Sequence, residues 1–301
     1  MTPELVGLLA GCRWLLYVAV LAVIGTEGAR FVTTRVRSDP FRAIFLTIQP
    51  RLDRLAVVAS IVWVLALAST FVAQFASWFG LQSFGDSGLV HAMLFRTRWG
   101  KAWIISFTSA AVAAAATGAS WWWASRRALR FLAPAAAILT TPLIGHAAGH
   151  GLLMWFLHAT HLLGTGMWLG TLLMLALTTW AFWRDESRSP THLRTMLQSF
   201  TPVALIGAAL TIATGVFMSA EYVLPVEKLL KTDYGRTLMV KIGIVTVVAI
   251  LGWINWRHLR PAAEITRKRR QLRRVVVAEL AIGLFVVLAV TAWLSGLPMP
   301  M

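Results

Sequence analysis

Residues 145–170 read GHAAGHGLLMWFLHATHLLGTGMWLG, in which a short glycine-rich turn is followed at once by a long apolar run. The run continues from Leu152 to Trp180, which exceeds the roughly 20 residues that a helix needs to cross a bilayer. Four of the chain's seven histidines fall within this stretch. Imidazole is costly in hydrocarbon unless it binds a ligand, pairs with a polar group or faces water. The stretch therefore predicts a membrane-spanning helix with a ligand site at its beginning.

The composition of the whole chain agrees with a membrane protein. Hydrophobic residues make up 58% of the 301 residues and charged residues only 13%, which excludes a soluble multidomain protein. We expect an all-α bundle of eight transmembrane helices, forming a single membrane domain over residues 1–301. The spans are predicted near residues 6–30, 55–79, 102–123, 129–146, 152–180, 200–220, 236–256 and 275–296.

The first run is the weakest of the eight, because Arg13 and Glu27 interrupt it. Both lie near its ends, where long side chains can reach the membrane interface. Its length, its charge distribution and the lack of a small-residue cleavage site argue against a removable signal sequence.

The net charge of +16 is distributed unevenly between the two sides of the predicted bundle. If the N-terminus lies outside, the inner loops hold 19 Lys and Arg residues and the outer loops near 80–101 and 221–236 hold six. This asymmetry follows the positive-inside rule and places both termini in the periplasm. The basic charge then meets the anionic lipid of the bilayer, and we expect no nucleic acid as a partner. Walker and Rossmann glycine motifs are absent from the sequence, so no nucleotide is expected either.

The histidine cluster has the features of a metal site. Cys12 is the only cysteine, which leaves His, Met, carboxylate and backbone groups as ligands. His146 and His150 fall in the hairpin at the outer surface. His158 and His161 share one face of the next helix at i and i+3, with His158 roughly 10 Å below the rim.

Met154 lies one turn above His158. Imidazole combined with thioether suits copper and favours Cu(I), although Cu(II) is possible. The predicted metal ligands are His146, His150, His158, His161 and Met154.

Lys241 is an ionisable residue inside an apolar run and is therefore a candidate for function. It has two alternatives, which are to extend outward to the interface or to pair with Glu221 or Asp233.

Glu27 and Glu279 lie toward the inner side and are candidates for an exit path. Pairing with Arg30 and Arg274 is the favoured interpretation for these two carboxylates.

The order of several short motifs resembles the bacterial copper resistance protein D family (CopD, PcoD). The motifs are Gly145-His146, His158 and His161, Trp168-Leu169-Gly170, Ser199 to Ala204, Thr214-Gly215, Tyr234 to Leu238 with Lys241, Asn255 before Arg257, and Arg273-Arg274 leading to Glu279. The resemblance covers roughly residues 140–296, a CopD-like region. It implies an eight-span protein of the bacterial inner membrane associated with copper uptake from the periplasm. It also implies that His146, His158 and His161 contact copper, whereas His150 and Met154 rest on local geometry.

We therefore expect a copper transport protein and not an enzyme. Copper is captured at the periplasmic face, with a periplasmic copper-binding protein as a possible donor, and passes toward the cytoplasm. Two alternatives remain open. Histidines on neighbouring helices also ligate haem in membrane electron-transfer proteins, and His146 opposite His161 offers such a pair. The chain is alternatively a copper sensor or assembly partner that binds copper without moving it.

Overall fold

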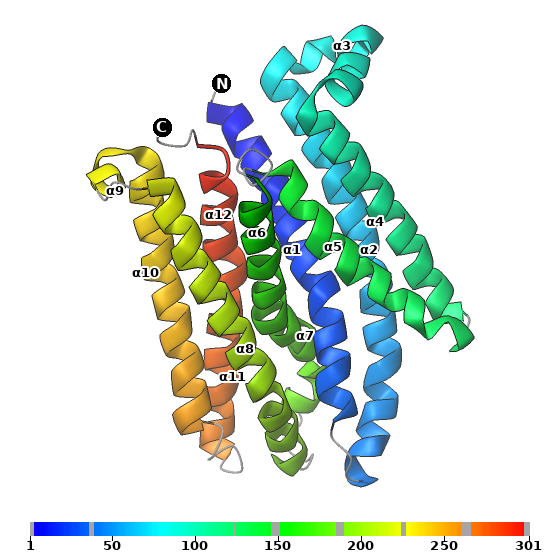
Figure 1. The fold of residues 1–301 in the computed structure, drawn as a ribbon. Helices are drawn as coiled ribbons and strands as arrows, with labels where there is room; N and C mark the ends of the chain where they lie inside the picture. The colour runs from blue at the N-terminus through cyan, green and yellow to red at the C-terminus, as the bar shows by residue number, and fades with distance from the viewer. Residues whose placement is uncertain are drawn as a thin grey trace.

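The computed structural model describes residues 3–35, 39–122, 124–145, 151–184, 190–223, 227–259 and 266–297, and every regular element within them is helical. Both ends of the chain lie at the same end of the bundle (Figure 1). We call this end the outer end and the opposite one the inner end, after the predicted topology. The spans, in order, are α1 (Pro3–Thr34), α2 (Asp39–Phe79), α4 (Arg98–Trp122), η3–α5–η4 (Ala124–Phe131, Leu132–Thr140, Thr141–Ile144), α6–η6–α7 (Gly151–Thr165, Gly166–Gly170, Thr171–Arg184), α8 (Pro190–Val223), α10–η7 (Asp233–Ile254, Asn255–Leu259) and α11–η8–α12 (Thr266–Ala281, Ile282–Val287, Leu288–Leu294).

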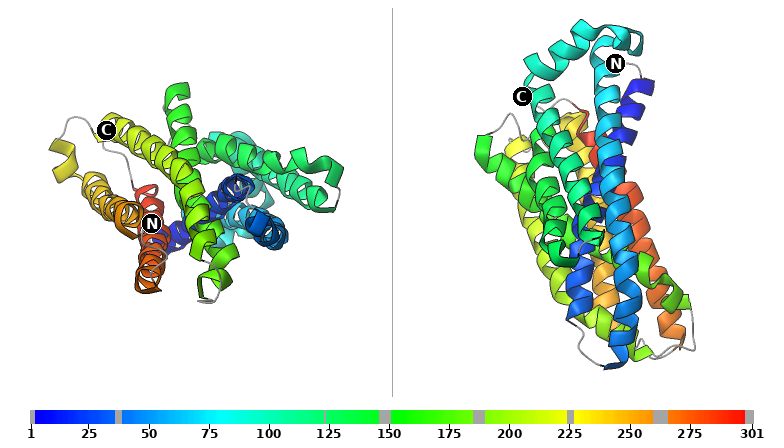
Figure 2. Two further views of the ribbon diagram at one scale, coloured as in Figure 1. Left: turned by 90° about the horizontal axis from the view of Figure 1, so that it is seen from below. Right: turned by 90° about the vertical axis from the view of Figure 1, so that its right-hand side faces the viewer.

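Short helices at the outer end complete the structure: η1 (Leu81–Gly85), α3 (Ser87–His91) and η2 (Ala92–Arg96) join α2 to α4, and α9 (Glu227–Lys231) precedes α10. Figure 2 shows the segment around α3 extending beyond the rest of the bundle.

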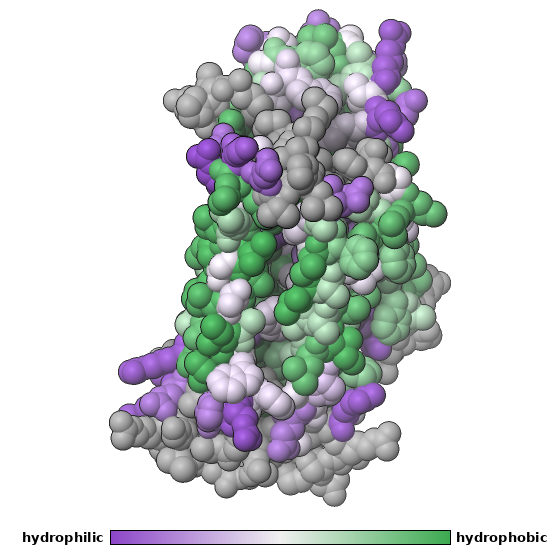
Figure 3. All heavy atoms as spheres, turned by 60° about the vertical axis from the view of Figure 1, so that its left-hand side comes forward, coloured by the Kyte–Doolittle hydropathy of each residue, from purple (hydrophilic) through white to green (hydrophobic). Residues whose placement is uncertain are grey.

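The all-α membrane bundle predicted from the sequence is confirmed. Seven helices of the described residues are long and apolar enough to cross a membrane, and Ala128–Ile144 is a shorter apolar helix of the same kind. The ends of this shorter helix are 3₁₀, and a rise of about 2.0 Å per residue there extends it to roughly 30 Å, the hydrocarbon thickness of a bilayer. Figure 3 shows an apolar band around the middle of the molecule between two hydrophilic ends.

The first span, which is the weakest in sequence, occupies the centre of the bundle. α1 packs against α2, α5, α7, α8, α12 and η6, and Figure 2 shows it surrounded by other helices when seen along the bundle. Its polar residues are therefore held by contacts with the neighbouring helices. Arg13 donates to Ser295 Oγ and to Gln74 Oε1, each at 3.2 Å, and so connects α1 with α12 and α2.

The inner end of α1 is fixed by a network of ion pairs. Glu27 pairs with Arg30 at 3.0 Å, as the sequence favoured, and also with Arg130 of η3 at 3.3 Å. Arg30 is buried and additionally pairs with Asp53 of α2. Buried ion pairs of this kind do not guarantee stability, but removing one partner leaves an uncompensated charge. The network therefore specifies how α1, α2 and η3 meet.

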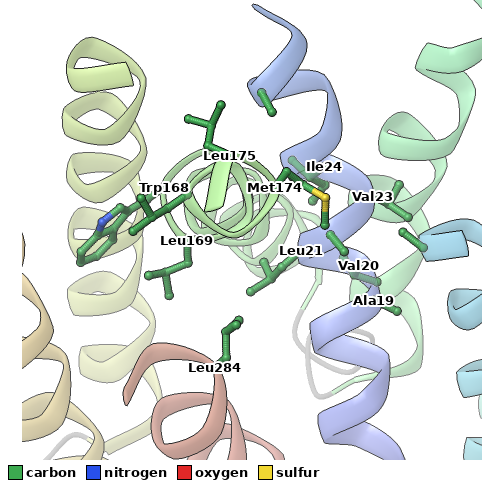
Figure 4. Close-up of a cluster of buried hydrophobic side chains, with 14 of the residues drawn as sticks. Ala19, Val20, Leu21, Val23, Ile24, Trp168, Leu169, Met174, Leu175 and Leu284 are labelled. Carbon is green, nitrogen blue, oxygen red and sulfur yellow. The ribbon is translucent and has the colours of Figure 1, made fainter. Parts of the chain in front are cut away.

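Glycines allow α1 and η6 to approach more closely than residues with a Cβ atom would permit. A Cβ atom at Gly25 would overlap the backbone of Gly170, and one at Gly166 would overlap the side chain of Ile24. Small residues at helix interfaces in membranes have this effect, because association there depends on van der Waals packing. Figure 4 shows the buried side chains around this contact, with Leu21 and Ile24 of α1 facing the α6–η6–α7 span. The close approach fixes the position of the span that carries His158 and His161.

We predict that Gly25→Ala lowers the melting temperature of the purified protein in detergent. The new methyl group is forced against the Gly170 backbone, and overpacking of this kind typically costs about 1–3 kcal/mol. Gly243→Ala on α10 is the matched control, because a Cβ there meets nothing within 4 Å. Equal melting temperatures for the two variants would contradict the close packing of α1 and η6.

Candidate metal site at the outer end of α6

His158 and His161 lie on α6, and both imidazoles are half-buried. Counted from Gly151, the rise of a helix places them roughly 10 and 15 Å below its outer end. The two imidazoles lie within electrostatic range of each other. The predicted pair therefore exists as neighbours inside the outer half of the bundle.

A hydrogen bond from α8 orients His161. The imidazole Nδ1 lies 3.0 Å from Thr214 Oγ1, while the Thr214 hydroxyl donates to the carbonyl of Leu210 at 2.6 Å. Because that hydroxyl proton is already used, Thr214 Oγ1 accepts from His161 Nδ1–H. The other ring nitrogen, Nε2, then carries a lone pair that is available to a metal. Metal-ligating histidines are usually held in this way by a second group.

Small residues bring α8 close enough for this contact. A Cβ at Gly164 would overlap the carbonyl of Gly207, so the two helices touch through backbone atoms. One turn below His161, the hydroxyls of Thr165 and Thr211 lie 3.3 Å apart. The seam between α6 and α8 is therefore close-packed and lined with hydroxyl groups next to His161.

Two methionines lie in the packed cluster above the histidines. Met154 of α6 and Met218 of α8 are both buried in a cluster with Tyr234, Leu238 and Leu294. Met154 was predicted from its position one turn before His158, whereas Met218 was not. The available signal was its spacing of i+4 from Thr214, which places both residues on one face of α8. The arrangement gives two thioethers in the layer above two imidazoles.

Lys241 of α10 is half-buried and lies within electrostatic range of His161. Glu221 and Asp233 are both exposed, and among the described ion pairs neither joins Lys241. The pairing that the sequence offered as one alternative is therefore not observed. The ammonium group instead contributes positive charge beside the histidine pair.

Two of the five predicted ligands, His146 and His150, lie outside the described residues. Within the described ranges, no group of three or more His, Cys, Asp or Glu side chains is placed to hold a metal ion. His91 and His258 are exposed, on α3 and η7, and belong to other parts of the molecule. The described part of the candidate site consists of two imidazoles with methionine sulfur nearby, a small set of nitrogen and sulfur donor groups.

Glu279 is held differently from the favoured expectation of a pair with Arg274. Its carboxylate accepts hydrogen bonds from Trp168 of η6 and Asn255 of η7, while Arg274 is exposed. Trp168, interpreted from the sequence as a packing residue, therefore has a polar role as well.

The fold and this site define a multi-pass helical membrane protein with soft donor groups beneath its outer end. Comparison with protein families gives two matches, to the copper resistance protein D-like N-terminal domain over residues 2–155 and to copper resistance protein D over residues 194–294. The chain belongs to the copper resistance protein D family, as its motifs indicated. His158 and His161 fall between the two matched ranges.

A curated relative, "Copper transport protein CutJ" of Bacillus subtilis (strain 168), is 28% identical over 227 residues. The alignment covers 71% of this chain and 39% of the relative, so the chain spans about two fifths of that protein's length. No solved structure matches the chain.

We predict that Thr214→Val weakens copper binding by roughly 10- to 100-fold, since loss of a group that orients a metal-binding histidine typically has this effect. Valine has nearly the same shape but cannot accept the Nδ1–H hydrogen bond. Affinity is measured by competition with a Cu(I) chelator on the purified protein. The matched control is Thr246→Val on α10, where the exposed hydroxyl bonds only to its own helix at Ile242. Equal affinities in the two variants would show that Thr214 does not orient a ligand.

Proposed function

We propose that this protein carries copper across the bacterial inner membrane, from the periplasm toward the cytoplasm. The observation that carries the proposal is the hydrogen bond from His161 to Thr214, which leaves Nε2 of a half-buried imidazole available to a metal. Membership of the copper resistance protein D family and the name of the CutJ relative support copper as the cargo. The role is that of a transporter and not of an enzyme.

Copper first meets His146 and His150 at the outer surface in this proposal. It then passes the thioethers of Met154 and Met218 and reaches His158 and His161. Thioether sulfur selects Cu(I) over harder ions. A site with few ligands also suits transport, because an ion that is bound too tightly cannot leave.

The direction rests on the predicted topology. The positive-inside rule places both termini in the periplasm, so the site lies near the side from which copper arrives. An inward cation gains about 2.3 kcal/mol per charge for each 100 mV of membrane potential, which supplies a driving force without nucleotide. The lipid bilayer is the permanent partner, and we propose a periplasmic copper-binding protein as the donor of the ion.

We predict that a variant with His158→Ala and His161→Ala loses copper accumulation in proteoliposomes, down to the level of empty vesicles. Both imidazoles of the described site are then absent. The control is His258→Ala, which removes an exposed histidine of η7 on a different span. Both proteins are checked for folding by their elution in gel filtration. Undiminished uptake by the double variant would overturn the site assignment.

Elemental analysis separates the proposal from the haem alternative suggested by the sequence. We expect the purified protein, exposed to copper under reducing conditions, to bind copper with negligible iron, and the double histidine variant to lose that copper. Stoichiometric iron would instead indicate haem. Copper binding by wild-type protein without flux through proteoliposomes would support a sensor or assembly partner.

A further inference from the structure

Three of the described spans contain a π-helical turn, and all three turns lie near one buried carboxylate. Trp168 belongs to η6, Asn255 begins η7, and η8 begins three residues after Glu279. Such turns occur frequently at functional sites. Their convergence on Glu279 is not needed to hold the histidine pair, which lies farther toward the outer end.

The Glu279 side chain is enclosed by protein. It is 3% exposed, and its Oε1 and Oε2 atoms accept hydrogen bonds from Trp168 Nε1–H and Asn255 Nδ2–H, each at 3.1 Å. Gly252 makes room for the carboxylate, because a Cβ there would lie only 3.3 Å from Oε1. An ionisable residue so placed within a membrane span is a functional candidate, because burying it is costly.

Asn255 supplies an independent observation. The residue is 2% exposed, and its carbonyl oxygen Oδ1 has no hydrogen-bond partner among the described residues. Buried polar atoms are rarely left in this state, and each one needs an explanation. A rotation of the amide exchanges Nδ2 and Oδ1, so that Asn255 can donate to a carboxylate or accept from a carboxylic acid. Asn255 is therefore able to hydrogen-bond Glu279 in both of its protonation states.

The donor atoms indicate which ion this site takes. The oxygens of Glu279 and Asn255 are hard ligands, unlike the imidazole and thioether groups of the outer half, and do not suit Cu(I). We propose that Glu279 is a proton-binding residue of the inner half of the bundle, with Asn255 as its positioning residue. The proton binds Oε2, the carboxylate becomes a neutral carboxylic acid, and no other bond changes.

On the elements around Glu279, the charged and titratable groups whose side chains are described lie on α10, η7 and α11: Asp233, Tyr234, Arg236, Lys241, Arg257, His258, Arg270, Arg273 and Arg274. Asp233, Tyr234 and Arg236 belong to the first turn of α10, at the outer end. Lys241 lies 14 positions from Asn255, or roughly 21 Å along the helix. η6, η8 and the described side chains of α7 carry no charge. The groups on η7 and α11 lie toward the inner end.

A proton bound at Glu279 is a candidate coupled ion for copper transport, and this coupling rests on the proposed function. Trp168 lies seven residues beyond His161, so Glu279 is roughly 10 Å farther inward along the same span. A cation that moves from the histidines into the inner half favours the carboxylate over the acid by electrostatic attraction. Copper entering this half therefore displaces the proton of Glu279.

Infrared difference spectroscopy tests the proton site without any need for transport. We expect the carbonyl band of a protonated carboxylic acid to appear on acidification. The band is lost in Glu279→Gln, shifts in frequency in Asn255→Leu, and stays in the control Glu221→Gln, which changes an exposed carboxylate. A band that is absent from wild type, or that persists in Glu279→Gln, would overturn the inference.

Proteoliposomes that contain a trapped pH dye test the coupling. In wild type we expect copper entry to be accompanied by proton movement, and in Glu279→Gln we expect that proton signal to be lost while Cu(I) binding to the purified protein is unchanged. Copper flux with the same proton signal in Glu279→Gln would overturn the coupling.

The two experiments together separate the proton site from the proposed function. If wild type moves no copper but shows the infrared band, the proposed function falls and the proton site stands. If copper moves through His158 and His161 without any infrared band, the function stands and the proton site falls.

Discussion

The close approach of α1 to η6 is the constraint on which the rest of the bundle depends. Without side chains at Gly25 and Gly170, the two backbones come into direct contact. In a bilayer there is no hydrophobic gain from bringing two apolar helices together, so this close van der Waals contact is what holds them. Once α1 is held at the centre, the α6–η6–α7 span is fixed against it and α8 is fixed against α6. The orientation of His161 is a consequence of that second contact, because Thr214 belongs to α8.

Partly buried polar groups near both ends of the bundle are held by polar partners on neighbouring helices. Arg13 is held by Gln74 and Ser295 near the outer end, and Glu27 takes part in ion pairs near the inner end. These contacts satisfy buried groups that would otherwise be costly in a low-dielectric interior. α10 differs from the other spans, since it packs chiefly on the α11–η8–α12 span and leaves most of its surface to the apolar band. The side chains on this span that are shielded by neighbouring helices include Tyr234 and Asn255, which are buried, and Lys241, which is half-buried.

The sequence was sufficient for the membrane-bundle class of fold and for the neighbouring positions of His158 and His161. Hydropathy depends on about 20 consecutive residues and the i, i+3 relation on one helical turn, so both are local. The contacts between spans could not be predicted from the sequence. Thr214, Met218 and the partners of Glu279 lie on helices far apart in the chain, and nothing local specifies which faces meet. The partners of Arg13 could not be predicted for the same reason, because Gln74 and Ser295 lie on other helices.

The separation of soft and hard donors along the bundle bears on how a cation would cross it. Imidazole and thioether groups lie in the outer half, and the carboxylate and amide oxygens of Glu279 and Asn255 lie farther inward. In the proposed transport, a soft cation held by the outer groups would find no equally good ligands among these inner groups, so the inner half would favour release over storage. A negative charge there still attracts the ion electrostatically, and its strength depends on whether Glu279 carries a proton. Affinity in the outer half and charge in the inner half are then set by different residues. Substitution of Thr214 or of Asn255 should therefore change one of these properties without changing the other.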